Sequence, residues 1–336
     1  MDDMRLKICV VIPCYKVRER ILDVIGKIGP EVSRIFVVDD CCPEGTGVFV
    51  EHACPDARVR VIGNSVNQGV GGAVMAGYKA AIAEGLDIIV KVDGDGQMDP
   101  TLIPDFVAPI AAGEADYTKG NRFFDLEQIH VMPKTRLLGN ALLSFMTKIS
   151  SGYWDLFDPT NGFTAIHVDV ARHLPFEKIS RRYFFETDML FHLNRLRAVV
   201  VDVPMDAKYG DEVSNLKVPN IIGEFMAKHM RNFAKRIFYN YYLRDMSLAS
   251  IELPIGILMF LAGAIFGLVH WMNSLRTGIL TPPGTVMFSA LPVIIGTQFI
   301  LAFIGHDISS IPKNPIHLRR KRLNSIKFKY IQKDSR

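Results

Sequence analysis

Two long stretches that are almost free of charge constrain this 336-residue chain most strongly. They run from Ile251 to Met272 and from Thr285 to Ile304. Each has about the length at which a helix crosses the apolar part of a bilayer. Their polar exceptions, Glu252, His270 and Gln298, are explained by headgroup or helix-helix contacts more simply than by a functional role. The sequence therefore predicts a two-helix membrane hairpin, with a buried hairpin of a soluble protein as the alternative.

The charges that flank the two stretches predict the orientation of the hairpin. The loop 273–284 has Arg276 as its single charge, whereas the tail after Lys313 is strongly basic. By the positive-inside rule, both termini and the large N-terminal part are expected in the cytoplasm, and the protein is expected to be a multi-pass protein of the inner (cytoplasmic) membrane. A basic tail also suits nucleic acid, but that interpretation leaves the spans unexplained. We therefore expect the lipid bilayer, and no nucleic acid, as a partner.

The segment between the N-terminal part and the first span has an amphipathic pattern. From Val218 to Arg244, apolar side chains alternate with Lys and Arg at near-helical spacing, and the segment ends in the cluster Tyr239-Asn240-Tyr241-Tyr242. This pattern predicts one or two helices lying in the membrane interface, although packing against the soluble domain also explains the apolar face. The expected organisation is a cytoplasmic domain (1–217), juxtamembrane helices (218–248), a transmembrane hairpin (249–306) and a basic tail (307–336).

The N-terminal part alternates buried strands with helices. Apolar, β-branched runs at 6–13, 34–40, 59–62 and 86–90 are typical of parallel strands, and helical patterns lie between them at 18–28, 46–52 and 69–84. This order predicts an α/β fold with a mostly parallel sheet and helices on both faces. Ligands of such sheets bind outside the carboxyl ends of the strands, which places the loops 13–17, 39–42 and 93–97 on one rim.

The loop Asp93-Gly94-Asp95 is the strongest chemical signal on this rim. Two carboxylates on a tight loop supply the hard oxygen ligands that Mg²⁺ and Mn²⁺ prefer, together with water and substrate phosphates. The same residues also occur in ordinary turns. The glycine-rich opening Gly69–Gly72 has two explanations as well, close helix-strand packing or direct phosphate contact.

The cysteines carry no assigned chemistry. Five of them crowd into the first sixth of the chain, at Cys9, Cys14, Cys41, Cys42 and Cys54. Their spacing matches no zinc pattern and no secretory signal precedes them, so we expect reduced thiols in a cytosolic domain.

Several motifs in order give the chain a family resemblance. They include Ile12-Pro13-Cys14-Tyr15, Val37-Val38-Asp39-Asp40, Asn67-Gln68-Gly69, Asp93-Gly94-Asp95-Gly96-Gln97, Gly120-Asn121-Arg122, Asp158–Phe163, Phe185-Glu186-Thr187-Asp188 and Tyr209-Gly210-Asp211-Glu212. In order and spacing they resemble the inverting, family 2 nucleotide-sugar glycosyltransferases with the GT-A fold. Together with two C-terminal spans, the set resembles the polyprenyl-phosphate glycosyltransferases, the group that includes dolichyl-phosphate mannose synthase.

The resemblance implies roles for individual residues. It implies a nucleotide-sugar site at Pro13, Tyr15, Asp39, Asp40, Asn67, Gly69 and Asp93, a Mg²⁺ or Mn²⁺ site at Asp93, Asp95 and Gln97, an acceptor-phosphate site at Arg122, Arg136, Asn140 and Lys217, and catalytic roles for Asp158, Asp188, Arg122 and Arg136. The chain departs from the family where Lys16-Val17 follows Tyr15 and where Cys41-Cys42 follows Asp40. Both departures touch the nucleotide pocket and leave the base open.

The implied reaction transfers a sugar, with inversion, from a nucleoside diphosphate sugar to undecaprenyl or dolichyl phosphate. We expect a UDP-sugar donor and a product used in cell-envelope glycan, such as lipopolysaccharide, or glycoconjugate assembly. A phosphate monoester is mostly a dianion at neutral pH, because its second pKa is about 6, so a strong general base is less necessary than for a hydroxyl. Asp158 and Asp188 stay candidates for either a base or an orienting group.

Two other functions remain as alternatives. One is a hydroxyl-acceptor or processive polysaccharide synthase, although such enzymes usually carry a Gln-x-x-Arg-Trp motif, which Trp154 and Trp271 do not complete. The other is a non-enzymatic, membrane-tethered nucleotide-sugar-binding scaffold, which would not require both the acidic loop and the two arginines. Two short spans per chain are also compatible with a homo-oligomer.

Overall fold

The computed structural model describes residues 6–124, 134–206 and 218–318, without the side chains of 134–138 and 218–222. Contacts divide the chain into two units. One, here called the sheet unit, comprises Met1–Phe233 and Pro312–Arg336, and the other, the hairpin unit, comprises Ala234–Ile311. The expected organisation, with boundaries at 217, 248 and 306, stays a prediction; by contacts, residues 218–233 and 312–318 both belong to the sheet unit.

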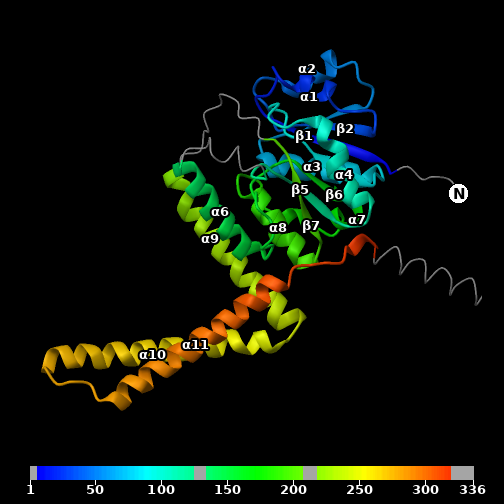
Figure 1. The fold of residues 1–336 in the computed structure, drawn as a ribbon. Helices are drawn as coiled ribbons and strands as arrows, with labels where there is room; N and C mark the ends of the chain where they lie inside the picture. Colours follow the sequence, from blue (N-terminus) through cyan, green and yellow to red (C-terminus); the bar gives the residue numbers. More distant parts are fainter. Residues whose placement is uncertain (1–5, 125–133, 207–217, 319–336) are drawn as a thin grey trace, which may run out of the picture. The chain divides into compact units, whose positions relative to one another are not determined.

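A seven-stranded sheet forms the centre of the sheet unit, with the strand order β3-β2-β1-β4-β6-β5-β7. All neighbours are parallel except β6, which runs antiparallel to β4 and β5. The predicted α/β class with a mostly parallel sheet is confirmed (Figure 1). The strands are β1 (Ile8–Cys14), β2 (Val32–Asp39), β3 (Val59–Gly63), β4 (Ile88–Lys91), β5 (Tyr117–Asn121), β6 (Thr164–His167) and β7 (Val200–Pro204).

Helices connect the strands. The helices of this unit are α1 (Ile21–Gly26), α2 (Thr46–Ala53), α3 (Val70–Ala83), η1 (Pro100–Leu102), α4 (Ile103–Ala111), α6 (Lys134–Ser151), α7 (Val168–Ala171), η2 (Phe176–Lys178), α8 (Phe185–Leu196) and the first part of α9 (Val218–Phe238). Of these, α1, α2, α3 and α9 fall in segments where the periodicity predicts them, and the others were not predicted. The first helix is shorter than the predicted 18–28, because residues 18–20 form a turn.

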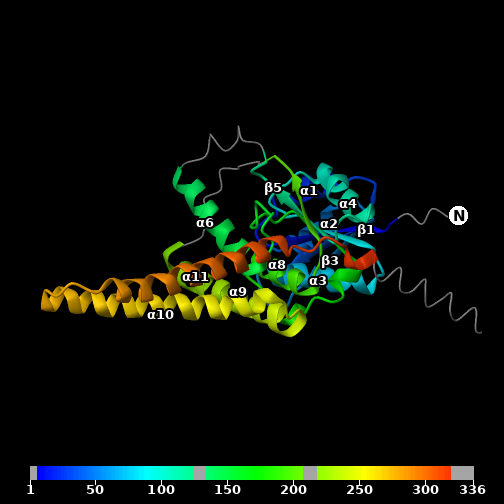
Figure 2. The ribbon, with the colours of Figure 1, turned by 60° about the horizontal axis from the view of Figure 1, so that its bottom comes forward.

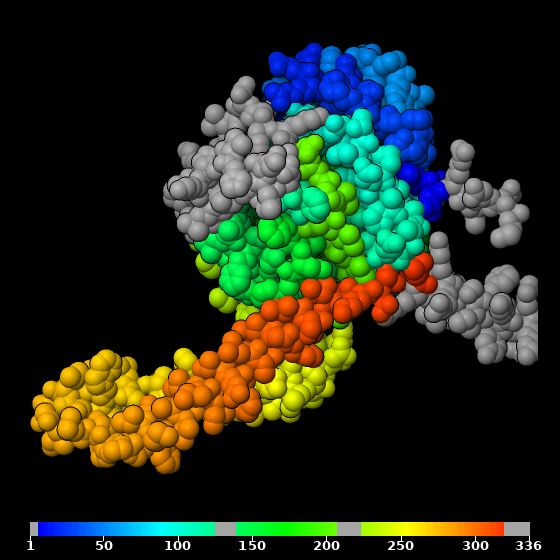
Figure 3. Space-filling model, in the orientation of Figure 1, coloured from blue at the N-terminus to red at the C-terminus, as the bar shows by residue number. Residues whose placement is uncertain are grey.

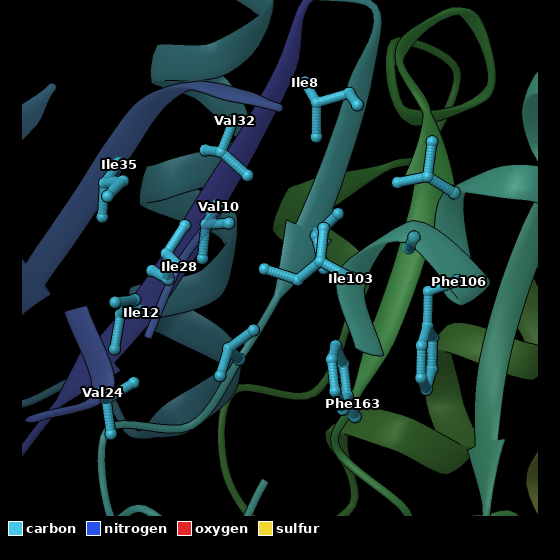
Figure 4. Close-up of a cluster of buried hydrophobic side chains, with 14 of the residues drawn as sticks. Ile8, Val10, Ile12, Val24, Ile28, Val32, Ile35, Ile103, Phe106 and Phe163 are labelled. Carbon is cyan, nitrogen blue, oxygen red and sulfur yellow. The ribbon is translucent and has the colours of Figure 1, made fainter. Parts of the chain in front are cut away.

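The core lies on the face of the sheet that α1, α2 and α4 cover. Successive side chains of a strand point to opposite faces, so Ile8, Val10 and Ile12 of β1 enter this core, as Figure 4 shows. At its other end, Phe106 of α4 stacks on Phe163 with ring centroids 3.9 Å apart. The packing aligns the carboxyl ends of the parallel strands, which is where the candidate site forms.

The segment after the hairpin returns to the sheet unit at Asp116. This carboxylate is fully buried and accepts hydrogen bonds from the backbone N–H groups of Val199 (2.9 Å), Ile316 (2.9 Å) and His317 (3.1 Å). The His317 ring also lies 2.7 Å from Asp116 and stacks on His167 at 4.4 Å. In Figure 3 the red atoms of this segment border the cyan surface of α4.

The hairpin unit contains the two helices that the sequence predicts. They are α10 (Leu248–Thr277) and α11 (Pro283–Ser309), and among the described residues they alone are long and apolar enough to cross a membrane. Their backbones approach closely, since a Cβ atom on Gly296 would lie 2.6 Å from the backbone N of Phe260. Figure 2 shows them side by side. Only 11% of the most apolar window of each helix is buried, unlike the core hairpin of a soluble protein.

A buried ion pair joins the beginning and the end of the hairpin unit. Arg236 of α9 donates to both carboxylate oxygens of Asp307 in α11, at 2.6 and 2.9 Å. The hydroxyl of Tyr241 donates to the same carboxylate at 2.6 Å. Tyr241 belongs to η3, a π-helix at Tyr239–Arg244 that follows α9 directly. The amphipathic segment is thus one α-helix with a π-helical end.

Replacing Asp116 with alanine should release residues 312–318 and lower the melting temperature of the protein in detergent. The change leaves three backbone N–H groups, two of them buried and that of Ile316 partly buried, without their acceptor, and each loss of a buried group's partner costs about 1–3 kcal/mol. Limited trypsin digestion after the exposed Lys313 would report the release directly. Asp105→Ala, at an exposed carboxylate of α4, is the matched control. Unchanged melting and unchanged cleavage in Asp116→Ala would contradict the assigned role.

Candidate active site

A cavity of about 560 Å³ opens at the carboxyl ends of β1 and β4. It combines the three loops that the sequence places on one rim with two loops beside them. The residues that line it are Pro13, Cys14, Tyr15, Val17, Asp40, Asn67, Gly69, Val70, Ala73, Asp93, Gly94, Asp95, Arg182 and Tyr183. Of the residues expected in the nucleotide-sugar and metal sites, Asp39 and Gln97 do not line this cavity. Arg182 and Tyr183 were not predicted from the sequence to lie in the site, because neither a recognised motif nor a strand end marks their loop.

The two aspartates at the end of β2 each hold a neighbouring loop by hydrogen bonds. Asp40 is buried and accepts hydrogen bonds from Asn64 Nδ2 (2.8 Å) and from the backbone N–H groups of Gln68 (2.9 Å) and Gly69 (2.7 Å). Asp39 accepts from the N–H groups of Cys42 (2.7 Å) and Gly47 (2.5 Å). Asp39 therefore fastens the start of α2, and Asp40 fastens the loop before α3.

The glycine-rich start of α3 packs against the chain before α8. The carbonyl oxygen of Arg181 accepts hydrogen bonds from the N–H groups of Gly71 (2.9 Å) and Gly72 (3.3 Å). Gly69 has a φ of +82°, and a Cβ atom there would lie 2.6 Å from the same carbonyl oxygen. Close packing is therefore the explanation for Gly71 and Gly72, because this carbonyl occupies N–H groups that a phosphate would need.

Asp93 and Asp95 both face the cavity, but their carboxylates have different partners. Asp93 Oδ1 lies 2.8 Å from the buried Nζ of Lys91. Asp95 Oδ1 accepts from the backbone N–H of Gln97 at 3.0 Å. Among the described residues no three His, Cys, Asp or Glu side chains group as a metal cage. Two carboxylates beside open space still suit Mg²⁺ or Mn²⁺, which take one or two carboxylates and complete their shell with water and substrate phosphates.

Two buried lysines and a glutamate lie beneath this acidic loop. Burial alone would lower the pKa of Lys91, but Asp93 and Glu186 raise it above the ordinary value. Burial lowers the pKa of Lys119 to about 8, and its ammonium donates to the carbonyl of Asn161. Burial also raises the pKa of Glu186. At neutral pH, Lys91 is therefore a cation that partly balances the charge of Asp93.

Arg122 and Asp158 form a two-pronged ion pair. Arg122 Nε donates to Asp158 Oδ2 at 2.7 Å, and Nη2 donates to Oδ1 at 3.0 Å. Asp158 is fully buried, which would raise its pKa, but the hydrogen bonds and charge of Arg122 lower the pKa below the ordinary value. Asp158 is thus a weak base. Of its two candidate roles, base and orienting group, this geometry favours the orienting one, with Arg122 as the group that it orients.

The loop that carries Asp158 is held from β7 by Asp202. Asp202 Oδ2 accepts from the backbone N–H of Phe157 at 2.8 Å. Burial raises the pKa of Asp202 to about 6. This carboxyl group therefore changes its charge in the range where a phosphate monoester does.

A second, mostly apolar cavity of about 290 Å³ lies beside Phe123, which follows Arg122 in the chain. Its lining residues are Phe123, Asn140, Ala141, Ser144, Phe145, Lys148 and Phe157. Asn140, expected to bind the acceptor phosphate, is one of them. Arg136 lies in the first turn of α6, but its side chain is outside the described residues, as is the whole of Lys217.

Asp188 lies in α8, away from both cavities. It is buried, and its carboxylate accepts from the backbone N–H of Ser180 at 2.7 Å and from Nδ2 of Asn232 in α9 at 2.8 Å. Both oxygens therefore hold chain segments. This geometry favours an orienting role for Asp188 over a role as base.

Comparison with known proteins agrees with this geometry. The family model described as "Glycosyl transferase family 2" matches residues 9–174. An undecaprenyl-phosphate mannosyltransferase from Micrococcus luteus is 30% identical over 204 residues, which cover 60% of this chain and 83% of the relative. A UDP-N-acetylglucosamine--dolichyl-phosphate N-acetylglucosaminyltransferase from Methanococcus voltae is 27% identical over 216 residues, which cover 60% of this chain and 86% of that protein.

Solved structures agree on the fold. Glucosyl-3-phosphoglycerate synthase from Mycobacterium tuberculosis, in complex with phosphoglyceric acid, superposes with a TM-score of 0.52 at 19% identity, covering 69% of this chain and 80% of that one. The same enzyme with Mn²⁺, UDP-glucose and phosphoglyceric acid gives a TM-score of 0.51 at 20% identity, over 69% and 79% of the two chains. The fold is GT-A, and this chain belongs to glycosyl transferase family 2.

Proposed function

We propose that this protein is a membrane-bound, inverting glycosyltransferase that moves a sugar from a UDP-sugar to polyprenyl phosphate. The observation that carries the proposal is the presence, in one unit, of an acidic cavity at the strand ends and an apolar cavity beside Arg122. The first suits a nucleoside diphosphate with a divalent cation, and the second suits the first isoprene units of a lipid whose phosphate lies near Arg122. The Micrococcus luteus and Methanococcus voltae relatives, named for undecaprenyl- and dolichyl-phosphate, support this acceptor class.

The donor chemistry rests on Asp93 and Asp95. These carboxylates would hold Mg²⁺ or Mn²⁺, and the bound cation would neutralise charge on the departing diphosphate. The Mycobacterium tuberculosis enzyme binds Mn²⁺ with UDP-glucose, and the Methanococcus voltae relative is named for a UDP-sugar, which supports the same donor class here. An ion pair with the buried Lys91 holds Asp93 in place.

The acceptor chemistry rests on Arg122 and Asp158. An oxygen of the phosphate dianion attacks the anomeric carbon from the side opposite the diphosphate, so the configuration inverts. Asp158 orients the planar guanidinium of Arg122 toward the acceptor, and Asn140 adds an amide donor. No carboxylate needs to remove a proton, because the nucleophile is already ionised.

The membrane attachment rests on the hairpin unit and on the exposed side of α9. Met226 and Met230 of α9 are exposed, as are most apolar side chains of α10 and α11. The chain leaves the sheet unit after Phe233 and returns to it at Pro312. Both ends of the hairpin are therefore connected in sequence to the sheet unit, and the basic tail favours the cytoplasm for these ends.

Label transfer from a panel of sugar nucleotides tests the reaction. Detergent-solubilised protein with Mg²⁺ or Mn²⁺ and polyprenyl phosphate should move labelled sugar from a UDP-sugar into the organic phase. Transfer from GDP-sugars alone would show that the nucleotide base of the donor is guanine and not uracil. Label in a water-soluble polymer, with none in the organic phase, would refute the proposal in favour of a polysaccharide synthase, and no transfer with nucleotide binding would favour a scaffold.

Within that assay, Asp93→Ala and Asp95→Ala should each reduce transfer by at least about a hundredfold, because charge stabilisation of the leaving group is lost. Chelation of the cation should do the same to the wild type and should be reversed by added Mn²⁺. The melting temperature of Asp95→Ala should stay near that of the wild type, whereas Asp93→Ala should melt lower, because it removes the nearest counter-charge of the buried Lys91. Asp105→Ala removes a carboxylate outside the cavity and should keep full activity. Full transfer by either cavity variant would rule out the metal assignment.

The pH profile separates the nucleophile from the protein carboxylates. The transfer rate should fall as the pH drops through about 6, because the acceptor phosphate gains a proton. Asp202, with a pKa of about 6, would produce a similar fall if it controlled the rate. We expect transfer by Asp158→Asn to be about ten- to a hundredfold slower than by the wild type, and transfer by Asp202→Asn to be only mildly slower. In both variants the rate should still fall as the pH drops through about 6. If this fall were absent in either variant, the replaced carboxylate would be its source.

Thiol labelling tests the orientation of the hairpin. Leu280 lies in the short loop between α10 and α11 and is 89% exposed. In intact cells, a membrane-impermeant maleimide should label Leu280→Cys and leave the wild type unlabelled, although Cys41 is exposed on the sheet unit. After membrane disruption both proteins should be labelled. Labelling of the wild type in intact cells would place the sheet unit outside.

A further inference from the structure

The donor cavity carries more negative than positive charge. Asp93 and Asp95 face it, and the carboxylate of Asp40 lies in its wall. Among the described residues that line the cavity, Arg182 is the single cation. A nucleoside diphosphate brings further negative charge, so a cation of the protein facing the cavity has an evident electrostatic use.

Arg182 is available for such a ligand. Its side chain is exposed, and no described side chain forms an ion pair with it. The neighbouring Arg181 differs, because its guanidinium lies 3.6 Å from Glu177 and does not line the donor cavity. The side chain of Arg182 passes beside Gly69, where a Cβ atom would lie 2.9 Å from its Cγ. The lack of a side chain at Gly69 thus leaves room for Arg182 at the cavity wall.

The short segment that carries Arg182, residues 180–183, is held at both sides. Toward the cavity, the carbonyl oxygen of Arg181 accepts the N–H groups of Gly71 and Gly72 in α3. Toward α9, the N–H of Ser180 donates to Asp188, whose other oxygen accepts from Asn232. Asp188 and Asn232 are each about 1% exposed, so the bond between these two side chains is shielded from water.

We propose that Arg182 binds the diphosphate of the donor, and that Asn232 of α9 positions it through Asp188. This inference rests on the proposed function, whose nucleotide site it completes. Arg182 would contact the ligand, whereas Asp188 and Asn232 would act only through the backbone of the 180–183 segment. The helix that leads to the membrane hairpin thereby sets one wall of the donor cavity.

Binding of UDP and of uridine, with Mn²⁺ present, tests the contact. A charge-assisted hydrogen bond to phosphate predicts that Arg182→Gln weakens UDP about ten- to a hundredfold and leaves uridine unchanged. Arg181→Gln removes the same charge one residue away and should bind UDP as the wild type does. Equal UDP binding by Arg182→Gln would overturn the inference alone, as would an equal loss for uridine. If the wild type bound neither UDP nor GDP, the proposed function would fail, and the inference with it.

A double-mutant cycle tests the positioning step. Asn232→Ala should weaken UDP binding in the protein with Arg182, but it should cause no further loss in Arg182→Gln, because the residue it positions is gone. Circular dichroism and the melting temperature check that each variant folds. Additive losses in the double variant, or wild-type UDP binding by Asn232→Ala, would show that Asn232 does not act through Arg182.

Discussion

The carboxylate of Asp188 joins two segments of the chain that lie 52 residues apart, Ser180 and Asn232. Each of its two oxygens accepts one of these hydrogen bonds, and Asp188 itself is about 1% exposed. The 180–183 segment that Asp188 holds contributes Arg182 and Tyr183 to the donor cavity, and its Arg181 carbonyl accepts the N–H groups at the start of α3. Buried hydrogen bonds to an ionised group are strong, and each is costly to leave unmade. Hydrogen bonds outside the donor cavity therefore determine the position of one of its walls.

The aspartates around the site divide into two groups by what they bind. Asp39 and Asp40 hold backbone N–H groups, and Asp158 holds the guanidinium of Arg122. Asp93 and Asp95 line the donor cavity and are the carboxylates proposed above to hold a cation. Most aspartates of this rim thus hold loops or Arg122 in place, and the proposed cation ligands are only Asp93 and Asp95.

Periodicity and strand-end chemistry were sufficient to predict the four strands β1 to β4, the rim and the two apolar helices, but not β5, β6 and β7. The pattern of apolar residues determines these features locally, as in β1 and α10. Arg182 could not be found this way, because its place depends on the contact of Arg181 with α3, which is distant in sequence. The same limit applies to Asp39, which the motif places at the ligand although its carboxylate holds Cys42 and Gly47.

The return of the chain to Asp116 makes the hairpin an insertion within the sheet unit. Residues 312–318 are synthesised after both α10 and α11, yet they supply two of the three backbone donors to a fully buried carboxylate. The domain cannot complete this part of its interior until the hairpin has left the ribosome. Assembly of the enzyme is thereby ordered in time, with the helices made before the domain is closed.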